Sequence, residues 1–295
     1  MDKNAFSDFI STKKILISDG ATGSSLQQRG LDKGTAAEKW VLENPQAIKQ
    51  LHLDFLQAGS DILLTCTFGA NRYRLEHAGL ADKVVEINSS AVRILREAIG
   101  ERPILAAGSI GPLGQMLQPL GLLSVEAAQK AYAEQALALR EAGVDMLVIE
   151  TQFDLQEARA AIEGTLSVCD LPIVCSFSYD RGVKTMMGVS PTKMAQELGE
   201  YELAALGINC GNSLADNLSC LKELRLATEL PIWFKPNAGL PTIDKMRNPV
   251  YSTTPQDMAE GVLEWIQSGA HIIGGCCGTS PEHLAAIAVE VNANR

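Results

Sequence analysis

The chain has 295 residues, of which 46% are apolar and 20% charged, and its net charge is −10. This length and composition suit one large domain with a substantial core, and the negative charge argues against binding to nucleic acid or anionic membranes. The amino terminus has no signal-peptide pattern and no run of residues approaches a membrane span, so we expect a cytoplasmic protein.

Eight short aliphatic and β-branched runs predict β-strands along the chain. They begin near Ile15, Ile62, Ile104, Met146, Ile173, Ala204, Ile232 and Ile272. Consecutive starts are about 27 to 47 residues apart, a spacing that accommodates a strand, a helix and two loops. The alternation predicts eight β-α units.

Helix boundaries are marked by proline at the start and glycine at the end. A capping residue followed by proline predicts helix starts at Pro45, Pro191, Pro255 and Pro281. Glycine just before the next strand predicts helix ends near Gly59, Gly143 and Gly269. No low-complexity linker interrupts the pattern, so we expect residues 1–295 to form a single domain.

Two α/β architectures fit this alternation, a (β/α)8 TIM barrel and an open Rossmann-like sheet. The Rossmann-like sheet needs a glycine fingerprint after its first strand, and the loop Asp19-Gly20-Ala21-Thr22-Gly23-Ser24 lacks the full pattern. Eight units in a chain of this length favour the (β/α)8 barrel. Reactive residues of such a barrel gather at the carboxyl ends of its strands.

Three cysteines lie at predicted strand ends. Cys210 ends the sixth strand, and the neighbours Cys276 and Cys277 end the eighth within a glycine-rich turn. Three thiolates would hold zinc and leave one coordination position open for a reactant. Such a site favours binding a substrate sulfur as thiolate over activating water, which predicts thiol alkylation. Core packing and a redox role are the alternatives for these cysteines.

Polar residues at the ends of other strands predict the rest of the pocket. Asp19 follows the first strand and Glu150 ends the fourth. These carboxylates could act as a general acid/base pair or hold a substrate ammonium group. The amides of Gly20 and Ala21 could bind a substrate carboxylate. The inferred ligand is a small thiol amino acid.

The motifs at the strand ends resemble those of the zinc-dependent homocysteine S-methyltransferase family. They read Asp19-Gly20-x-x-Gly23, Thr67-Phe68-Gly69-Ala70-Asn71-Arg72, Gly108-Ser109-Ile110-Gly111-Pro112, Glu150-Thr151, Gly207-x-Asn209-Cys210-Gly211 and Gly274-Gly275-Cys276-Cys277-Gly278-Thr279. They are most similar to the homocysteine-binding barrel of cobalamin-dependent methionine synthases. The resemblance covers almost the whole chain.

The resemblance implies a barrel that binds Zn2+ through three cysteines and methylates homocysteine to methionine. Asp19 and Glu150 match positions that hold the amino acid end of homocysteine, with the Gly20-Ala21 backbone, Thr67 and Ser109 as further neighbours. Departures from the methionine synthase pattern at Ala21, Ser24 and Cys66 leave open an altered acceptor pocket.

The methyl donor follows less directly from the sequence. The 295 residues contain no corrinoid-ligand motif and none of the corrinoid, folate or reactivation modules of a full methionine synthase. The expected donor is therefore a methylcobalamin or other methyl-corrinoid carried by a partner protein, and betaine or S-methylmethionine is the alternative. Quaternary ammonium ligands favour aromatic cages, whereas the chain is 5% aromatic and has aliphatic loops over 113–123 and 186–189. A zinc hydrolase and a non-catalytic zinc-binding accessory subunit are the other function classes.

Overall fold

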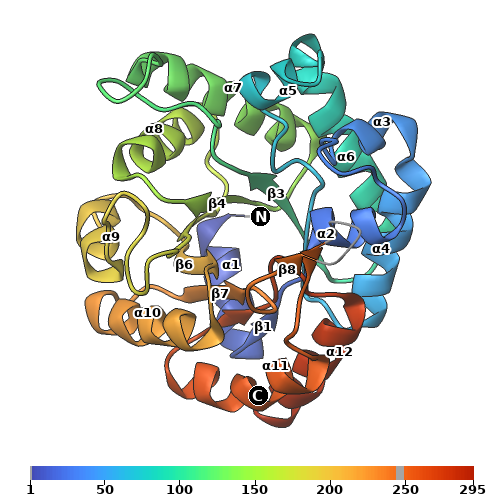
Figure 1. Ribbon diagram of the computed structural model, residues 1–295, viewed down its shortest axis with the longest axis vertical. Coiled ribbons are helices and arrows are strands. Elements are labelled where there is room, and N and C mark those ends of the chain that lie inside the picture. Colours follow the sequence, from blue (N-terminus) through green and yellow to red (C-terminus); the bar gives the residue numbers. More distant parts are fainter. Residues whose placement is uncertain (1, 244–248) are drawn as a thin grey trace.

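The computed structural model describes residues 2–243 and 249–295, which form a closed barrel of parallel strands with helices outside it (Figure 1). The barrel strands are β1 (Leu16–Ile17), β2 (Ile62–Leu64), β3 (Leu105–Ile110), β4 (Met146–Gln152), β5 (Ile173–Phe177), β6 (Ala205–Cys210), β7 (Ile232–Pro236) and β10 (Ile272–Ile273). They pair in the order β1-β10-β7-β6-β5-β4-β3-β2, and a parallel bridge from Ser18 to Ile62 closes the ring. The predicted (β/α)8 barrel is confirmed, and each strand begins within one residue of its predicted start.

The helices alternate with these strands and begin and end largely as the proline and glycine signals predict. They are α1 (Lys3–Lys13), α2 (Thr22–Gln28), α3 (Lys39–Glu43), α4 (Pro45–Gln57), α5 (Arg72–Glu76), α6 (Val84–Ile99), α7 (Val125–Ala142), α8 (Leu155–Leu166), α9 (Pro191–Leu198), α10 (Leu214–Ala227), α11 (Pro255–Gln267) and α12 (Pro281–Ala293), with a 3-10 turn η1 (Ala81–Lys83). All four predicted proline starts are confirmed. The glycines at 59, 143 and 269 take positive φ angles of 104°, 94° and 99°, a conformation that glycine adopts without steric cost.

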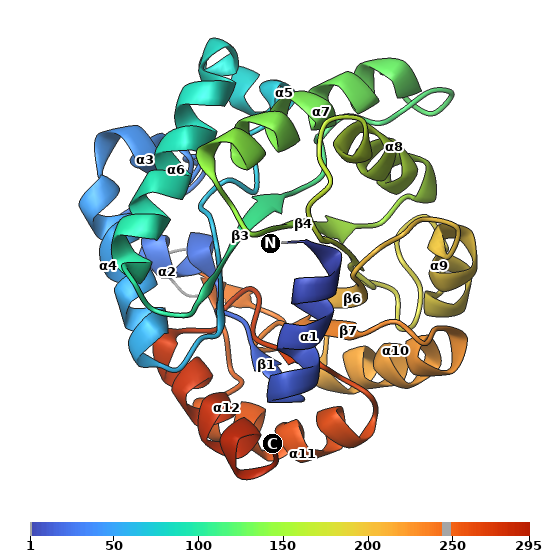
Figure 2. The ribbon, with the colours of Figure 1, turned by 180° about the vertical axis from the view of Figure 1, so that it is seen from behind.

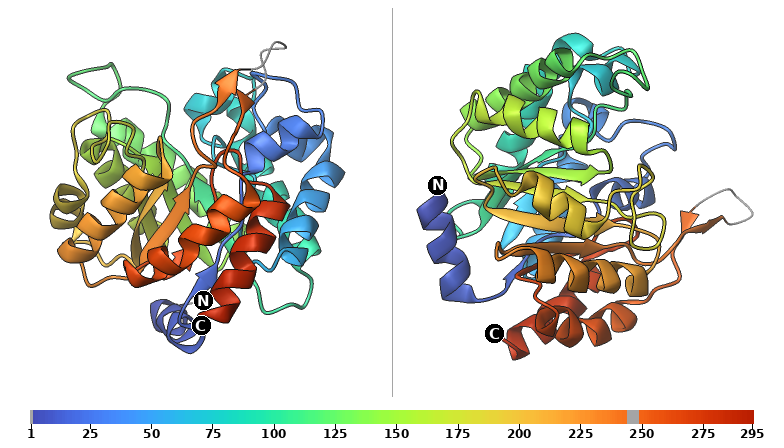
Figure 3. Two further views of the ribbon diagram at one scale, coloured as in Figure 1. Left: turned by 60° about the horizontal axis from the view of Figure 1, so that its bottom comes forward. Right: turned by 90° about the vertical axis from the view of Figure 1, so that its left-hand side faces the viewer.

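The barrel interior is closed at one end by a helix that the sequence pattern did not predict. Phe6 and Ile10 of α1 are buried against a cluster inside the barrel that includes Leu16, Ile62 and Trp233. Figure 2 shows α1 lying across this end of the barrel. A second unpredicted feature, the antiparallel pair β8 (Thr242–Ile243) and β9 (Pro249–Val250), projects from the opposite end (Figure 3). That opposite end holds the carboxyl ends of the strands.

The strand period of two determines which polar side chains face the barrel axis. Val148 and Trp233 belong to the cluster inside the barrel. Side chains two residues further along each strand point to the same face, which directs Glu150 and Lys235 to the axis near the carboxyl end. Both are buried, with 7% and 2% of their surface exposed. Buried charges at this level of a barrel indicate a binding site.

Within the described ranges, no helix has the length and apolar character needed to cross a membrane.

Candidate functional site

A cavity of about 400 Å³ opens at the carboxyl ends of the strands. Its walls come from the loop after β1, from the ends of β2, β3, β4, β6 and β7, and from the turn after β10. The predicted site residues line it with the exception of Thr67; they are Asp19, Gly20, Ala21, Ser109, Glu150, Cys210, Cys276 and Cys277. The structure therefore brings together residues that lie up to 258 positions apart in the chain.

The three predicted cysteines meet at one side of this cavity. Their sulfur atoms all lie within 4.8 Å of one another, and the Cys210 and Cys276 sulfurs are 2.8 Å apart. Among the residues that the structure describes, they are the only cluster of His, Cys, Asp and Glu side chains grouped closely enough to share a metal ion. Cys66, Cys169, Cys175 and Cys220 are buried free thiols outside this cluster, and of these four Cys66 also lines the cavity.

Unusual backbone conformations place the cysteines. Cys210 has a φ angle of 60°, a left-handed conformation that is uncommon for a residue with a Cβ atom. The turn after β10 is held by hydrogen bonds from the Thr279 hydroxyl to the Cys276 carbonyl (2.6 Å) and from the Cys276 amide to the Pro236 carbonyl (2.9 Å). Gly278, at φ 83°, packs so closely against the Tyr251 ring that a Cβ atom has no room. These constraints direct successive cysteines toward one point.

Asn209 joins the cysteine cluster to the neighbouring wall. Its amide nitrogen donates to the Thr151 hydroxyl at 2.6 Å and lies 3.6 Å from the Cys210 sulfur and 3.8 Å from the Cys276 sulfur. Its amide oxygen accepts from the Thr151 backbone N–H at 2.8 Å and from the Ser176 hydroxyl. Thr151 also has a positive φ angle of 60°. Asn209 was part of a recognised motif, but its linking role was not predicted.

The three thiols influence one another's ionisation. Hydrogen bonds from Cys210 and Cys276 lower the pKa of Cys277, whereas the hydrogen bonds with Cys276 and Cys277 raise the pKa of Cys210. Burial raises the pKa of Tyr251 to about 12, and the charges of the cysteines add to this effect. The cluster by itself therefore favours one thiolate stabilised by neighbouring thiols. Three simultaneous thiolates need a cation between them.

The donor set fits zinc. Zn–S bonds of about 2.3 Å in a tetrahedron place sulfur atoms roughly 3.8 Å apart, and the three sulfurs of this cluster lie within 4.8 Å of one another. The Cys210 and Cys276 sulfurs, now 2.8 Å apart, would separate by about 1 Å to bind the ion. The sulfurs lie on the cavity wall, and Cys277 is exposed, so a fourth position can face the cavity. Cys210, Cys276 and Cys277 are thus the residues that could hold the metal.

Lys235 and Asp19 form a buried ion pair on the cavity wall, which the sequence did not lead us to predict. The Lys235 ammonium donates to Asp19 Oδ1 at 2.6 Å, and Asp19 Oδ2 accepts from the Leu64 amide at 2.8 Å. Burial by itself lowers the pKa of Lys235, but the charges of Asp19 and Glu150 outweigh it and the net pKa is raised. Asp19 therefore lies where predicted, with both oxygen atoms already bonded.

Glu150 and Ser109 form a second polar pair on the cavity wall. The Ser109 hydroxyl donates to Glu150 Oε1 at 2.5 Å. Burial raises the pKa of Glu150 to about 7, even though Lys235 opposes this shift. Glu150 can therefore change its charge near neutral pH, in the cavity that the three cysteines also line.

Thr67, Ala21 and Gly20, which we expected to contact the substrate, instead make contacts within the protein. The Thr67 hydroxyl donates to the Ser109 carbonyl at 2.7 Å and shares a 2.6 Å hydrogen bond with the Thr65 hydroxyl, so Thr67 supports the wall from behind. The Ala21 amide donates to the carbonyl and hydroxyl oxygens of Thr279 at 3.2 and 3.1 Å. This amide is therefore occupied inside the protein. Gly20 lies so close to the Phe55 ring that an added Cβ would be 2.7 Å from it.

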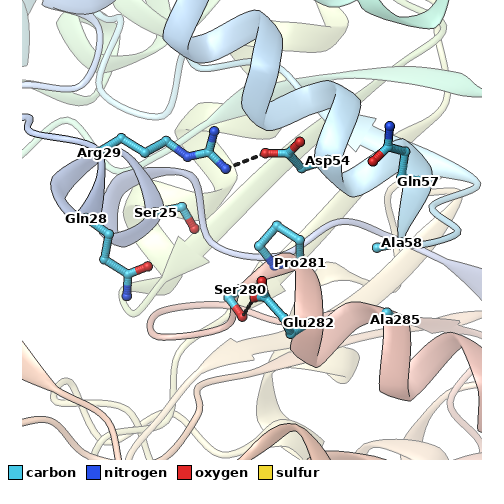
Figure 4. A pocket seen from close by; sticks show the side chains of 10 residues that line it. All are labelled: Ser25, Gln28, Arg29, Asp54, Gln57, Ala58, Ser280, Pro281, Glu282 and Ala285. Atoms are coloured by element: carbon cyan, nitrogen blue, oxygen red, sulfur yellow. Dashed lines mark hydrogen bonds and ion pairs between the residues drawn. The ribbon is translucent and has the colours of Figure 1, made fainter.

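A second cavity of about 640 Å³ lies outside the barrel, between α2, α4 and α12 (Figure 4). Its charged groups are paired locally: Arg29 with Asp54 at 2.5 Å, and Glu282 with the Ser280 hydroxyl at 2.5 Å. None of the predicted site residues lines it. The chemistry described above therefore belongs to the smaller cavity at the strand ends.

Comparisons with known proteins identify the family to which the chain is similar. A family model described as homocysteine S-methyltransferase matches residues 16–291. The chain is 28% identical to homocysteine S-methyltransferase YbgG of Bacillus subtilis over 97% of each chain, and 27% identical to a methionine synthase of Mycobacterium tuberculosis, of which it spans only 25%. The metallated form of the homocysteine methyltransferase MmuM from Escherichia coli superposes with a TM-score of 0.82 at 28% identity, covering 96% of this chain and 98% of MmuM.

Proposed function

The chain belongs to the homocysteine S-methyltransferase family, and we propose that it methylates homocysteine to methionine with zinc held by Cys210, Cys276 and Cys277. The observation that carries this proposal is the meeting of three cysteine sulfurs on the wall of a cavity that also contains a buried carboxylate. Zinc at this position would supply a site where the acceptor sulfur binds as a thiolate, ready to attack a methyl group.

The protein's own residues orient the acceptor. Glu150 faces the cavity with its Oε1 fixed by Ser109, and as a carboxylate it can accept hydrogen bonds from the acceptor's ammonium group. The Asn209 amide nitrogen, 3.6 to 3.8 Å from two sulfurs, restrains the cysteines and offers a weak donor to their negative charge. Loss of methionine is favoured because a thioether is a poorer metal ligand than a thiolate.

For the methyl donor we favour a methyl-corrinoid carried by a separate protein. The loops after β3 and β5, at the same end of the barrel as the cavity, expose apolar side chains: Leu122 is 96% exposed, Leu120 67% and Met186 48%. Leu113 and Leu117, in the same 113–123 segment, are buried and hold this loop against the barrel. The exposed Leu120 and Leu122 are therefore not needed for its packing. These exposed apolar side chains could contribute to a face that binds a partner protein.

The cavity offers little for an onium donor. Phe68 is the only aromatic ring among the described residues that line it, and the Arg74 guanidinium already lies over that ring at 5.4 Å from its centroid. An aromatic cage for a quaternary ammonium group needs several free ring faces. This observation disfavours betaine and S-methylmethionine, which remain the alternative donors.

The test is a donor screen on zinc-loaded protein with homocysteine, in which methionine formation and loss of free thiol are measured. The donors are free methylcobalamin, a methylated corrinoid-binding fragment of a methionine synthase, betaine and S-methylmethionine, and Cys276→Ala is the inactive control. We expect turnover with the corrinoid fragment. Turnover with betaine or S-methylmethionine and with neither corrinoid would contradict the donor assignment alone. Absence of methionine with every donor would favour a non-catalytic accessory subunit.

A further inference from the structure

Lys235 places a positive charge inside the acceptor cavity. It ends up there because it lies two residues after Trp233 on β7 and faces the barrel axis. Its side chain lines the cavity although only 2% of the residue is exposed. Such a charge is costly to bury unless partners satisfy it, so its partners indicate its role.

The partners within the protein leave part of the ammonium group unused. Lys235 Nζ donates one hydrogen bond, to Asp19 Oδ1 at 2.6 Å, and makes no other hydrogen bond to the residues that the structure describes. A lysine ammonium group has three N–H donors. The ammonium group also lies 5.4 Å from the centroid of the Trp233 ring, which can take a second N–H group. At least one donor is therefore left for solvent or for a ligand in the cavity.

The other charged groups of the cavity are not equally available. Asp19 is neutralised by Lys235, and its second oxygen accepts from the Leu64 amide at 2.8 Å. Glu150 accepts one hydrogen bond, from Ser109, and has no cation within ion-pair distance among the described residues. The available charges are thus a carboxylate at Glu150 and at least one unused N–H group at Lys235.

This pattern complements a zwitterionic amino acid. Glu150 offers an acceptor for an ammonium group and Lys235 offers at least one donor for a carboxylate. Of the two backbone amides that could have bound the carboxylate, that of Ala21 is bonded to Thr279, which leaves only that of Gly20 beside Lys235. We infer that Lys235 binds the carboxylate of the acceptor amino acid and makes the site selective for thiols that carry an α-carboxylate. The inference rests on the proposed function and specifies how its acceptor is recognised.

The test compares dissociation constants of three thiols for the zinc-loaded protein by calorimetry. Homocysteine carries both charged groups, 3-aminopropane-1-thiol lacks the carboxylate, and 4-sulfanylbutanoate lacks the amino group. We expect wild-type protein to bind homocysteine on the order of 10- to 100-fold more tightly than 3-aminopropane-1-thiol, the range of a hydrogen bond to a charged group. Lys235→Met should remove this preference by weakening homocysteine and leaving 3-aminopropane-1-thiol within about threefold of wild type.

Two further variants keep the result interpretable. Lys235→Met leaves Asp19 buried without its cation, so the double variant Asp19→Asn/Lys235→Met, which removes both charges, should show the same loss of preference. If circular dichroism shows that Lys235→Met does not fold, the double variant replaces it in the comparison of the three thiols. Lys222→Met removes an exposed lysine that pairs with Glu264 at 2.8 Å on the barrel exterior, and should leave all three constants unchanged.

The outcomes separate this inference from the proposed function. Equal weakening of homocysteine and 3-aminopropane-1-thiol in the Lys235 variants would overturn the carboxylate-binding role, because Lys235 would then act only as a counter-ion for Asp19. In that case binding and methylation of homocysteine by wild-type protein would still support the proposed function. If none of the thiols bound to zinc-loaded wild-type protein, the proposed function and this inference would both be overturned.

Discussion

Glu150→Gln should stabilise the metal-free protein while weakening its acceptor site. Glu150 is 7% exposed, and burial raises its pKa from the ordinary 4.5 to about 7. Because the folded-state pKa lies above the unfolded one, the unfolded chain releases this proton first as the pH rises. The contribution of Glu150 to stability is therefore fully present below about pH 4.5 and is lost as the pH rises through 7.

The magnitude follows from the size of the pKa shift. A shift of one pKa unit corresponds to about 1.4 kcal/mol, so the ionised carboxyl group destabilises the fold by roughly 1 kcal/mol at pH 5 and roughly 3 kcal/mol at pH 8.5. The glutamine side chain of the variant cannot ionise and can still accept the hydrogen bond that Ser109 donates. The variant should therefore gain stability over wild type, and the gain should grow with pH.

Urea unfolding of metal-free wild type and Glu150→Gln at pH 5 and pH 8.5 measures this difference, because other titrating groups are shared by both proteins. In the zinc-loaded proteins, calorimetry should show that the same substitution weakens homocysteine far more than 4-sulfanylbutanoate, which lacks an ammonium group. A stability difference that is independent of pH, or a destabilised variant at pH 8.5, would refute the burial of a titrating carboxyl group at this position.

Three further predictions concern the cysteine cluster, the turn after β10 and the exposed loop after β3. Asn209→Leu should lower zinc affinity by about 10- to 100-fold, the usual effect of removing a residue that orients metal ligands, as measured by competition with a chelator; unchanged affinity would exclude that role. Gly278→Ala should lower the free energy of unfolding in urea by more than about 2 kcal/mol, because the position combines φ 83° with contact to Tyr251. Gly182→Ala is the matched control: its φ is 64° but no atom lies near the added Cβ, so the loss should be about 1 kcal/mol. Leu122→Glu should raise the KM for a methylated corrinoid protein at least severalfold and leave turnover of free methylcobalamin unchanged; an equal effect on both donors would exclude a docking role.

Local patterns were sufficient to predict the barrel and the cysteines. β-Branched runs, prolines at helix starts and glycines at helix ends are all short-range signals, and they placed each strand within one residue. The convergence of Cys210 with Cys276 and Cys277 followed from the barrel topology, since strand ends of a closed barrel share one rim. The unpredicted helix α1 has no strong signal in its mixed sequence, and it is stabilised by burial of Phe6 and Ile10 against the barrel floor.

The partners of the cavity residues could not be predicted from local patterns because they are distant in the chain. Asp19 and Lys235 are 216 positions apart, and Ala21 and Thr279 are 258 apart. The ion pair with Lys235 neutralises the charge of Asp19. The hydrogen bond to Thr279 occupies the Ala21 amide, which the sequence predicted as a donor to the substrate carboxylate. One signal was present: Lys235 lies two positions after Trp233 in a predicted strand. The alternation rule directs it into the barrel, where an unpaired lysine is not expected.

The central claim, that Cys210, Cys276 and Cys277 hold a zinc ion with one position open for the acceptor sulfur, is tested most directly by zinc X-ray absorption spectroscopy. We predict three sulfur ligands at about 2.3 Å in the zinc-loaded protein and four after addition of homocysteine. An unchanged sulfur count in the presence of bound homocysteine, or a site dominated by nitrogen and oxygen ligands, would contradict the claim.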